Sequence, residues 1–227
     1  MDLLLIGYGK MNHLVAEMAA EQGHRVVKTI RRPGEWVSGW TPGLVAIDFS
    51  VPEAVLDHVE RCMEAGIPLV IGTTGWNHHR ERVQELVSHA QVGVVYGANF
   101  SVGVHAFYRI VRAAAQSLPA SYEPYVWEAH HAQKRDAPSG TAKHLAALLE
   151  AGGRSGFSVA STRAGAIPGT HVVGWEGADD SITLTHTARS RRGFAAGAVV
   201  AAHWILGRRG LHEFGEVMDS IASGAPR

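Results

Sequence analysis

The chain has 227 residues, in which 21 lysine and arginine residues balance 21 aspartate and glutamate residues. Its length allows one large domain or two small ones, and 46% apolar with 19% charged residues is typical of a globular protein. The zero net charge argues against a nucleic-acid or membrane-surface binder, because both need an excess of cations.

Cysteine usage and the N-terminus predict a cytoplasmic protein. Cys62 is the only cysteine, which excludes an intramolecular disulfide and a zinc site built of thiolates. The apolar run Leu3–Ile6 is too short for a signal peptide and follows Asp2, where a cationic region is needed. No stretch approaches the roughly 20 apolar residues that a membrane span requires.

The first hundred residues alternate short apolar runs with helical patterns. Strands are predicted at Leu3–Gly7, Val26–Ile30, Leu44–Phe49, Pro68–Gly72 and Val92–Tyr96. Apolar residues at helical spacing separate these strands, which predicts βαβ units and a parallel α/β sheet. Such a sheet binds its ligands beyond the carboxyl ends of its strands.

The pattern changes after Asn99. A long helix around Val104–Ala114 is followed by strands at Tyr125–Ala129, Phe157–Arg163, His171–Glu176 and Ser181–Ala188, with one helix near Gly140–Glu150. This order predicts an α+β insertion with an open sheet. Two more helices are predicted at Phe194–Leu206 and Phe214–Ile221. We therefore expect one domain of residues 1–100 and 194–227, and an inserted domain of residues 101–193.

A glycine-rich loop directly follows the first predicted strand and opens a helix. Its residues are Gly7, Tyr8, Gly9, Lys10, Met11 and Asn12. Glycines at this place permit a tight turn and a close approach of the backbone to a pyrophosphate. The third glycine of the dinucleotide fingerprint is replaced by Asn12, so an ordinary turn between strand and helix remains an alternative.

The end of the second predicted strand indicates which nucleotide is bound. NAD-binding proteins place an acidic residue there for the ribose 2′-hydroxyl, whereas this chain has Arg31 and Arg32. Two cations suit a 2′-phosphate, which favours NADPH and leaves NADH possible. The alternative is an exposed pair without a ligand.

Two further loops carry small and polar residues at the carboxyl ends of strands. Gly72, Thr73 and Thr74 follow the fourth strand, and Ala98, Asn99 and Phe100 follow the fifth. Such loops allow the nicotinamide half of a cofactor to approach closely, although a glycine-rich loop of no special function has the same composition.

The densest cluster of polar residue types lies between Glu128 and Ala142. A strand ends in His130 and His131, a loop carries Lys134, and the run Pro138 to Thr141 opens a helix. The N–H groups of a first helical turn, with nearby hydroxyls, form a site for an anion. A histidine and a lysine beside it supply a proton donor and a fixed cation. The cluster predicts an anionic substrate, such as a carboxylate, and chemistry that involves a proton.

Other charged clusters are less specific. Arg189, Arg191 and Arg192 could hold a second carboxylate, or they could form an exposed charge cluster. The adjacent histidine pairs are poor candidates for a metal site, because neighbouring residues on a strand point to opposite faces. We therefore expect no metal.

Taken together, these motifs resemble the dihydrodipicolinate reductase family, also called 4-hydroxy-tetrahydrodipicolinate reductases. The resemblance spans nearly the whole chain and is carried by the motifs IGYGKMN, DFS, GTTG, ANFSVGVH, EAHHAQKRDAPSGTA, RAG and THTARSRRGFAAGAV. The HH-x-x-K-x-DAPSGTA string is the most specific of them. His171-Val-Val-Gly is a small departure from the Gly-Glu-His that the family commonly has.

The resemblance implies an oxidoreductase of lysine and diaminopimelate synthesis that reduces a cyclic dicarboxylate with NAD(P)H. It further implies a Rossmann domain, a substrate domain whose sheet builds a homotetramer, and a cleft that closes on the ligand. Roles are implied for the following residues: His130 as general acid, Lys134 near the developing charge, His131 and Arg191 on the substrate, and Ser139, Gly140 and Thr141 on one carboxylate.

Three other functions remain open at this point. Another nicotinamide-dependent reductase or amino-acid dehydrogenase would share the nucleotide domain but would not explain the HH-x-x-K-x-DAPSGT loop. A non-catalytic dinucleotide sensor would bind NADPH without turnover, and a metal-dependent hydrolase would lose activity with a chelator.

Overall fold

The structure, a computed structural model, describes residues 1–32, 35–36, 40 and 43–224. It divides into two compact units. Unit 1 consists of Met1–Val102 and Arg191–Arg227, and unit 2 consists of Gly103–Ser190.

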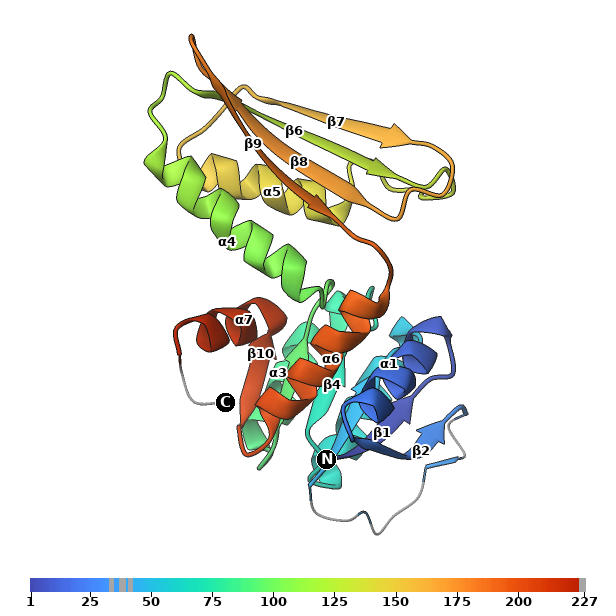
Figure 1. Ribbon diagram of the computed structural model, residues 1–227. Coiled ribbons are helices and arrows are strands. Elements are labelled where there is room, and N and C mark those ends of the chain that lie inside the picture. The colour runs from blue at the N-terminus through green and yellow to red at the C-terminus, as the bar shows by residue number, and fades with distance from the viewer. Residues whose placement is uncertain (33–34, 37–39, 41–42, 225–227) are drawn as a thin grey trace. The chain divides into compact units, whose positions relative to one another are not determined.

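Unit 1 is built on a parallel sheet of six strands in the order β10-β5-β4-β3-β1-β2 (Figure 1). In chain order its strands are β1 (Asp2–Ile6), β2 (Arg25–Ile30), β3 (Leu44–Asp48), β4 (Leu69–Ile71), β5 (Gly93–Tyr96) and β10 (Gly210–Glu213). Its helices are α1 (Lys10–Glu21), α2 (Val55–Glu64), α3 (Arg80–His89), α6 (Arg192–Ile205) and α7 (Phe214–Ala222), with short 3-10 turns at Pro52–Ala54 and Asn77–His79.

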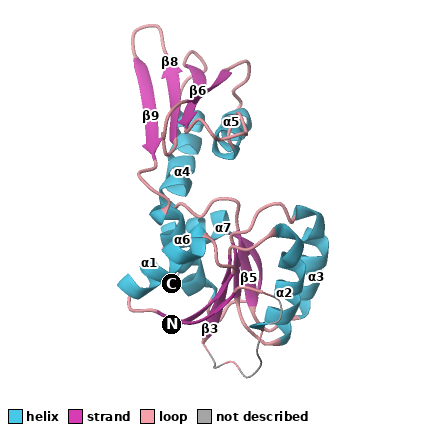
Figure 2. Ribbon diagram, turned by 90° about the vertical axis from the view of Figure 1, so that its right-hand side faces the viewer, coloured by secondary structure: helices cyan, strands magenta, loops and turns pink. Residues whose placement is uncertain are grey.

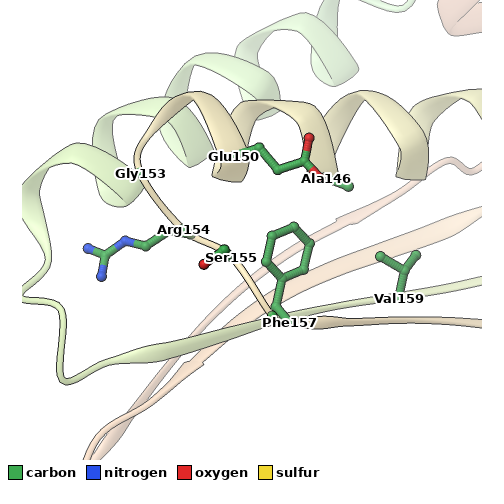
Figure 3. Close-up of a pocket in the computed structure, with 8 residues that line it drawn as sticks. Ala146, Glu150, Gly153, Arg154, Ser155, Phe157 and Val159 are labelled. Atoms are coloured by element: carbon green, nitrogen blue, oxygen red, sulfur yellow. The ribbon is translucent and has the colours of Figure 1, made fainter.

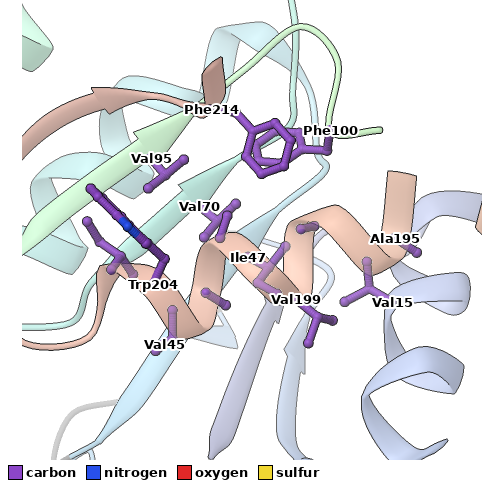
Figure 4. Close-up of a cluster of buried hydrophobic side chains, with 14 of the residues drawn as sticks. Val15, Val45, Ile47, Val70, Val95, Phe100, Ala195, Val199, Trp204 and Phe214 are labelled. Atoms are coloured by element: carbon purple, nitrogen blue, oxygen red, sulfur yellow. The ribbon is translucent and has the colours of Figure 1, made fainter. Parts of the chain in front are cut away.

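Helices cover both faces of this sheet, which explains its apolar strands. Figure 2 shows α2 and α3 on one side of the sheet, with α1 and α6 on the other. Strands β1 and β3 are buried along nearly their whole length, because a parallel sheet covered on both faces has no polar side. On the face covered by α6, the side chains of Ile47, Val70 and Val199 lie in one apolar cluster (Figure 4).

The strand order reverses between β1 and β3, since the chain adds β2 on one side of β1 and then β3 on the other. In sheets of this type, ligands bind beyond the strand ends at this reversal. The predicted Rossmann-type parallel sheet is confirmed. The strand β10 was not predicted, because its four residues at the sheet edge, three half-buried and one exposed, form no apolar run.

Unit 2 contains a mixed sheet in the order β7-β6-β8-β9. Its elements are α4 (Val102–Ser117), β6 (Glu123–His130), α5 (Gly140–Ala151), β7 (Ser158–Arg163), β8 (Thr170–Glu176) and β9 (Ser181–Thr187). Strands β6 and β7 are parallel, whereas β8 runs antiparallel to both β6 and β9. Apolar side chains of α4 and α5 pack together with β6 and β8 in one core, which includes Phe107, Leu145 and Trp175. The predicted open mixed sheet is confirmed.

Across the described ranges, no helix has both the length and the apolar character that crossing a membrane requires.

Candidate active site

Gly7 directly follows β1 at the reversal of strand order. Its φ of +101° favours glycine, and a Cβ built there would lie 2.5 Å from the carbonyl oxygen of Phe49, which follows β3. Only glycine therefore allows the loops after β1 and β3 to pack this closely.

Asn12 explains why the loop lacks a third glycine. Its side chain is 2% exposed, and its amide nitrogen donates to the carbonyl oxygens of Ile6 and Gly7, at 2.7 and 2.9 Å. It thus holds the end of β1 against the first turn of α1. Gly9 is the N-cap of α1 and provides no side-chain cap, and Tyr8 and Lys10 are exposed while Met11 is half-buried. The backbone of this turn fits an anion such as a pyrophosphate.

The two predicted cations lie exposed just beyond β2. The guanidinium carbon of Arg31 lies 3.9 Å from the ring centroid of Tyr8, a cation–π contact that connects the loops after β1 and β2. The backbone N–H of Arg31 donates to a carboxylate oxygen of Glu35 at 2.7 Å. Arg32 is also exposed.

A buried carboxylate fixes the loop that contains Gly72, Thr73 and Thr74. Asp48 accepts hydrogen bonds from the hydroxyl of Thr73 at 2.9 Å and from the backbone of Ser50 at 2.8 Å, and its second oxygen contacts His58 Nδ1 at 2.8 Å. The Thr73 side chain therefore points into unit 1, whereas Thr74 is exposed. A Cβ on Gly72 would overlap the ring of Phe49.

The loop after β5 is held by an aromatic cluster. Phe100 is buried, and its ring lies 4.6 Å from that of Phe214 and 6.3 Å from that of Phe49 between centroids. Ala98 is exposed, and the side-chain oxygen of Asn99 accepts the N–H of Ser101 at 2.8 Å. The structure thus brings the predicted cofactor residues of unit 1 to the carboxyl ends of β1, β2, β4 and β5.

In unit 2, His130 ends β6 and contacts a buried carboxylate. Its Nδ1 atom forms a short hydrogen bond with Glu128, which is completely buried on the same face of the strand. Arg163 on β7 donates to both oxygens of Glu128, at 2.7 and 3.0 Å. The ring of His130 lies edge-on to that of His171 on β8, with centroids 5.0 Å apart.

The pKa values in this cluster follow from burial and from these contacts. Burial alone would raise the pKa of Glu128, but hydrogen bonds from Arg163, Ser161 and His130 outweigh it and lower the pKa to about 2. Burial lowers the pKa of His130 despite the opposing effect of Glu128. Burial and the charge of His130 lower the pKa of His171 to about 4. At neutral pH Glu128 is therefore ionised and His171 is neutral.

The start of α5 belongs to the same cluster. Ser139 is the buried N-cap, and its hydroxyl oxygen accepts the N–H of Ala142 at 3.2 Å and forms a 3.1 Å hydrogen bond with His171 Nε2. The backbone N–H of Ser139 donates to Glu128 at 3.3 Å. A Cβ on Gly140 would meet no atom within 4 Å, so space beside this turn is open, and Thr141 follows half-buried.

The remaining predicted substrate residues differ in their surroundings. His131 is half-buried, and the ammonium of Lys134 pairs with Asp136 at 2.7 Å. Arg191 is exposed and precedes α6, so it belongs to unit 1. Arg192 pairs with Glu21 on α1 at 2.6 Å, which gives it a structural role within unit 1.

The side chains of Glu128, His130 and His171 have the composition of a metal site, and their ligand atoms lie within 4.8 Å of one another. However, the Arg163 guanidinium covers both oxygens of Glu128, and a fixed cation at that distance opposes a metal ion. We therefore assign no metal here.

A cavity of about 580 Å³ also lies in unit 2, between the carboxyl end of α5 and the start of β7 (Figure 3). Glu150, Phe157 and Val159 are among its lining residues. Arg154, another lining residue, donates to the carbonyl oxygens of Ala115 in α4 and of Pro119 just after that helix. None of the predicted site residues lines this cavity, so we do not assign the chemistry to it.

Sequence reasoning did not assign Glu128, Arg163, His171 and Asp48 to the site. One pattern in the sequence could have identified Glu128. On a strand, an acidic residue two positions before a histidine lies on the same face as that histidine. The partners from β7 and β8 depend on strand pairing, which the sequence does not reveal.

Unit 1 has a glycine loop at the reversal of strand order, and unit 2 has a histidine that is hydrogen-bonded to a carboxylate beside the start of a helix. Together these two features define a pyridine-nucleotide oxidoreductase with two units. The family models described as "Dihydrodipicolinate reductase, N-terminus" and "Dihydrodipicolinate reductase, C-terminus" match residues 1–100 and 103–218. The chain therefore belongs to the dihydrodipicolinate reductase family, oxidoreductases of lysine and diaminopimelate biosynthesis.

Curated relatives and solved structures agree with this assignment. The 4-hydroxy-tetrahydrodipicolinate reductase of Christiangramia forsetii is 33% identical over 97% of this chain and 99% of its own length. The enzyme of the same name from Natronomonas pharaonis is 35% identical over 94% of this chain and 98% of its own. The fold is similar to that of a dipicolinate-bound dihydrodipicolinate reductase from Paenisporosarcina sp. TG-14, with a TM-score of 0.79 at 19% identity, covering 94% of this chain and 97% of that one.

Proposed function

We propose that the chain reduces 4-hydroxy-tetrahydrodipicolinate, or its dehydrated form dihydrodipicolinate, to tetrahydrodipicolinate. Family membership supports the reaction. The observation that carries the proposal is that a single carboxylate, Glu128, contacts both a proton donor, His130, and the first turn of α5. A dicarboxylate ring that must accept a proton needs both features together.

We assign His130 as the general acid, which gives a proton to the ring after hydride addition. Lys134 stabilises the negative charge that develops toward the ring nitrogen. Its pair with the exposed Asp136 is of a kind that contributes little free energy, so the ammonium can exchange partners. Ser139, Gly140 and Thr141 hold one carboxylate, while His131 and Arg191 contact the substrate.

Unit 1 is proposed to bind the cofactor, and unit 2 to supply the substrate contacts other than that of Arg191. A bound nicotinamide would supply the hydride. The turn from Gly7 to Asn12 would hold the pyrophosphate, since Gly9 leaves the start of α1 without a side-chain cap. Exposed Arg31 and Arg32 favour NADPH through its 2′-phosphate, with NADH also accepted. The family resemblance further supports a homotetramer that works in the cytoplasm.

The test is a coupled assay with the aldol product of pyruvate and aspartate semialdehyde, with NADPH and NADH compared side by side. Oxidation of the cofactor, seen as loss of absorbance at 340 nm, is expected only when that product is supplied. General acid catalysis contributes about 10²–10⁴-fold, so His130→Gln and Lys134→Ala should each lower kcat at least about tenfold while NADPH still binds.

The alternatives give different outcomes in the same assay. A dinucleotide sensor would bind NADPH without turnover, and an amino-acid dehydrogenase would consume it with a 2-oxo acid and ammonia. Turnover near that of the wild type in both variants would contradict the catalytic assignment.

A further inference from the structure

Glu128 is a charged side chain at a place where solvent cannot reach it. It has no exposed surface and lies two residues before His130, so both side chains project from the same face of β6. An isolated buried carboxylate would be strongly disfavoured, and its presence requires partners that satisfy its charge.

Arg163 is the main partner of Glu128. Glu128 lies on β6 and Arg163 on β7. These strands pair in parallel, with His130 opposite Arg163 and Glu128 opposite Ser161. The guanidinium binds both carboxylate oxygens and also donates to the backbone oxygens of Thr162 at 2.8 Å and Asp136 at 2.6 Å. Arg163 is thus fixed on three sides, and it keeps Glu128 ionised.

An ionised carboxylate can only accept hydrogen bonds, which determines the tautomer of His130. The Nδ1 atom of His130 must carry a hydrogen to donate to Glu128, so Nε2 is the atom that exchanges a proton. A Cβ on Gly169 would lie 3.1 Å from this Nε2 atom, so the glycine leaves room beside it. The other oxygen of Glu128 accepts the N–H of Ser139, the N-cap of α5.

We propose that Glu128, held by Arg163, is the positioning residue of the reaction, because it orients His130 with Nε2 as the proton-donating atom and ties the anion-binding turn of α5 to it. The inference rests on the proposed function. When the Nε2 proton of His130 passes to the substrate ring, Nδ1 keeps its own hydrogen and stays hydrogen-bonded to Glu128. Solvent then returns a proton to Nε2. The charged and titratable groups that face His130 are Glu128 on its own strand, Lys134 in the next loop, Arg163 on β7 and His171 on β8.

The test compares Glu128→Gln with the wild type and with a matched control. Glu128→Gln should lower kcat at least about tenfold, as expected when the group that orients a catalytic histidine loses its charge. It should also move the alkaline limb of the kcat–pH profile to lower pH, because Glu128 raises the pKa of His130. The affinity for NADPH, which unit 1 is proposed to bind, should stay unchanged.

Trp127→Phe is the control, since Trp127 is the neighbour of Glu128 on β6 and faces the other side of the sheet. The variant Trp127→Phe loses the 3.1 Å hydrogen bond from the indole N–H to the hydroxyl of Thr162 on β7, and the contacts of His130 stay the same. We expect wild-type kcat and an unshifted pH profile.

Loss of folding is separated from loss of positioning by a second variant. Glu128→Gln leaves the half-buried guanidinium of Arg163 without its carboxylate partner, whereas Glu128→Gln/Arg163→Met removes that charge and should recover melting temperature. The proposal expects kcat to stay low in this double variant. Recovery of kcat together with stability would overturn it.

The outcomes also separate this inference from the function on which it rests. If the wild type has no activity in the coupled assay, the proposed function fails. If the wild type is active and His130→Gln is impaired, but Glu128→Gln keeps kcat within about twofold and an unshifted profile, only the positioning role fails.

Discussion

At the scale of single residues, two buried carboxylates have parallel roles in the two units. Asp48 joins the ends of β3 and β4 to His58 on α2, and Glu128 joins the end of β6 to β7 and to the start of α5. Each carboxylate is completely buried and has several donors. The loops at the candidate site are therefore held by side-chain hydrogen bonds as well as by the sheet.

The predicted preference for NADPH depends on Arg31 and Arg32. The double variant Arg31→Ala/Arg32→Ala should raise the Kd of NADPH at least about tenfold, because a charge-assisted contact to a phosphate contributes about 1.5–3 kcal/mol. The Kd of NADH should change little, since NADH lacks the 2′-phosphate. Fluorescence titration with both nucleotides measures this difference.

Arg25→Ala is the matched control for this experiment. Arg25 is an exposed cation at the opposite end of β2, where it pairs with Asp2 at 2.6 Å. Arg25→Ala should leave the Kd of NADPH and the Kd of NADH unchanged. Equal weakening of NADPH and NADH by the double variant would remove the 2′-phosphate assignment.

Residue types alone predicted a site at His130–His131, Lys134 and Ser139, because these residues lie close together in sequence, and the family resemblance implied which histidine is the general acid. Glu128 and Arg163 were not predicted as site residues, although both belong to motifs that carry the family resemblance. Their pairing joins β6 to β7 across 35 positions of sequence. Local patterns determine which residues share a face, but not which distant strand lies opposite.

At the scale of elements, the sequence predicted the strands of unit 1 that have continuous apolar runs and missed the short strand β10. The runs in β1 and β3 are continuous and buried, so the pattern is strong. Strand β10 has the sequence GLHE, pairs only with β5, and lies at the sheet edge. An edge strand of four residues has too few buried positions to form a recognisable period.

Helix α6 packs close to the loop after β5 through a glycine. A Cβ on Gly197 would overlap the backbone carbonyl of Phe100, whose ring packs against Phe214 in the cluster of Figure 4. Gly197→Ala should therefore lower stability by about 1–3 kcal/mol, or about 2–12 °C in melting temperature. It should also weaken NADPH binding, because the displaced Phe100 lies in a proposed cofactor loop.

Gly193→Ala, in the first turn of the same helix, is the control. The nearest atom to a Cβ at Gly193 is 3.9 Å away, which is ordinary contact. Replacing glycine by alanine there should keep or raise the melting temperature, since alanine favours the helix by up to about 1 kcal/mol. If Gly197→Ala melts like Gly193→Ala, the close packing of α6 on this loop is wrong.

At the scale of the whole molecule, equal numbers of positive and negative residues conceal an uneven distribution. Cations gather at Arg31–Arg32, Lys134–Arg135 and Arg189–Arg192, each in or beside a loop proposed to meet phosphate or carboxylate. Zero net charge therefore does not exclude the two small anions of the proposed function.

Acid should destabilise unit 2 before unit 1. The pKa of His171 is about 4 in the folded chain against an ordinary value of 6.5, so the unfolded state binds the proton more readily. Its contribution to stability is complete above pH 6.5 and is lost as the pH falls toward 4. The pKa of Glu128 is about 2 against 4.5, so its contribution is lost later, between pH 4.5 and 2.

Replacement of His171 tests this linkage. Between pH 7.5 and pH 5, His171→Gln should reduce the loss of unfolding free energy in unit 2 by about 2 kcal/mol, because glutamine does not titrate. Urea-dependent hydrogen exchange, corrected for intrinsic rates and resolved to peptides of β6, β8 and β9, measures that loss, and peptides of β1 and β3 report unit 1. His89→Gln, at the exposed end of α3, should behave like the wild type. An unchanged pH dependence in His171→Gln would show that the neutral, buried His171 is not what makes unit 2 sensitive to acid.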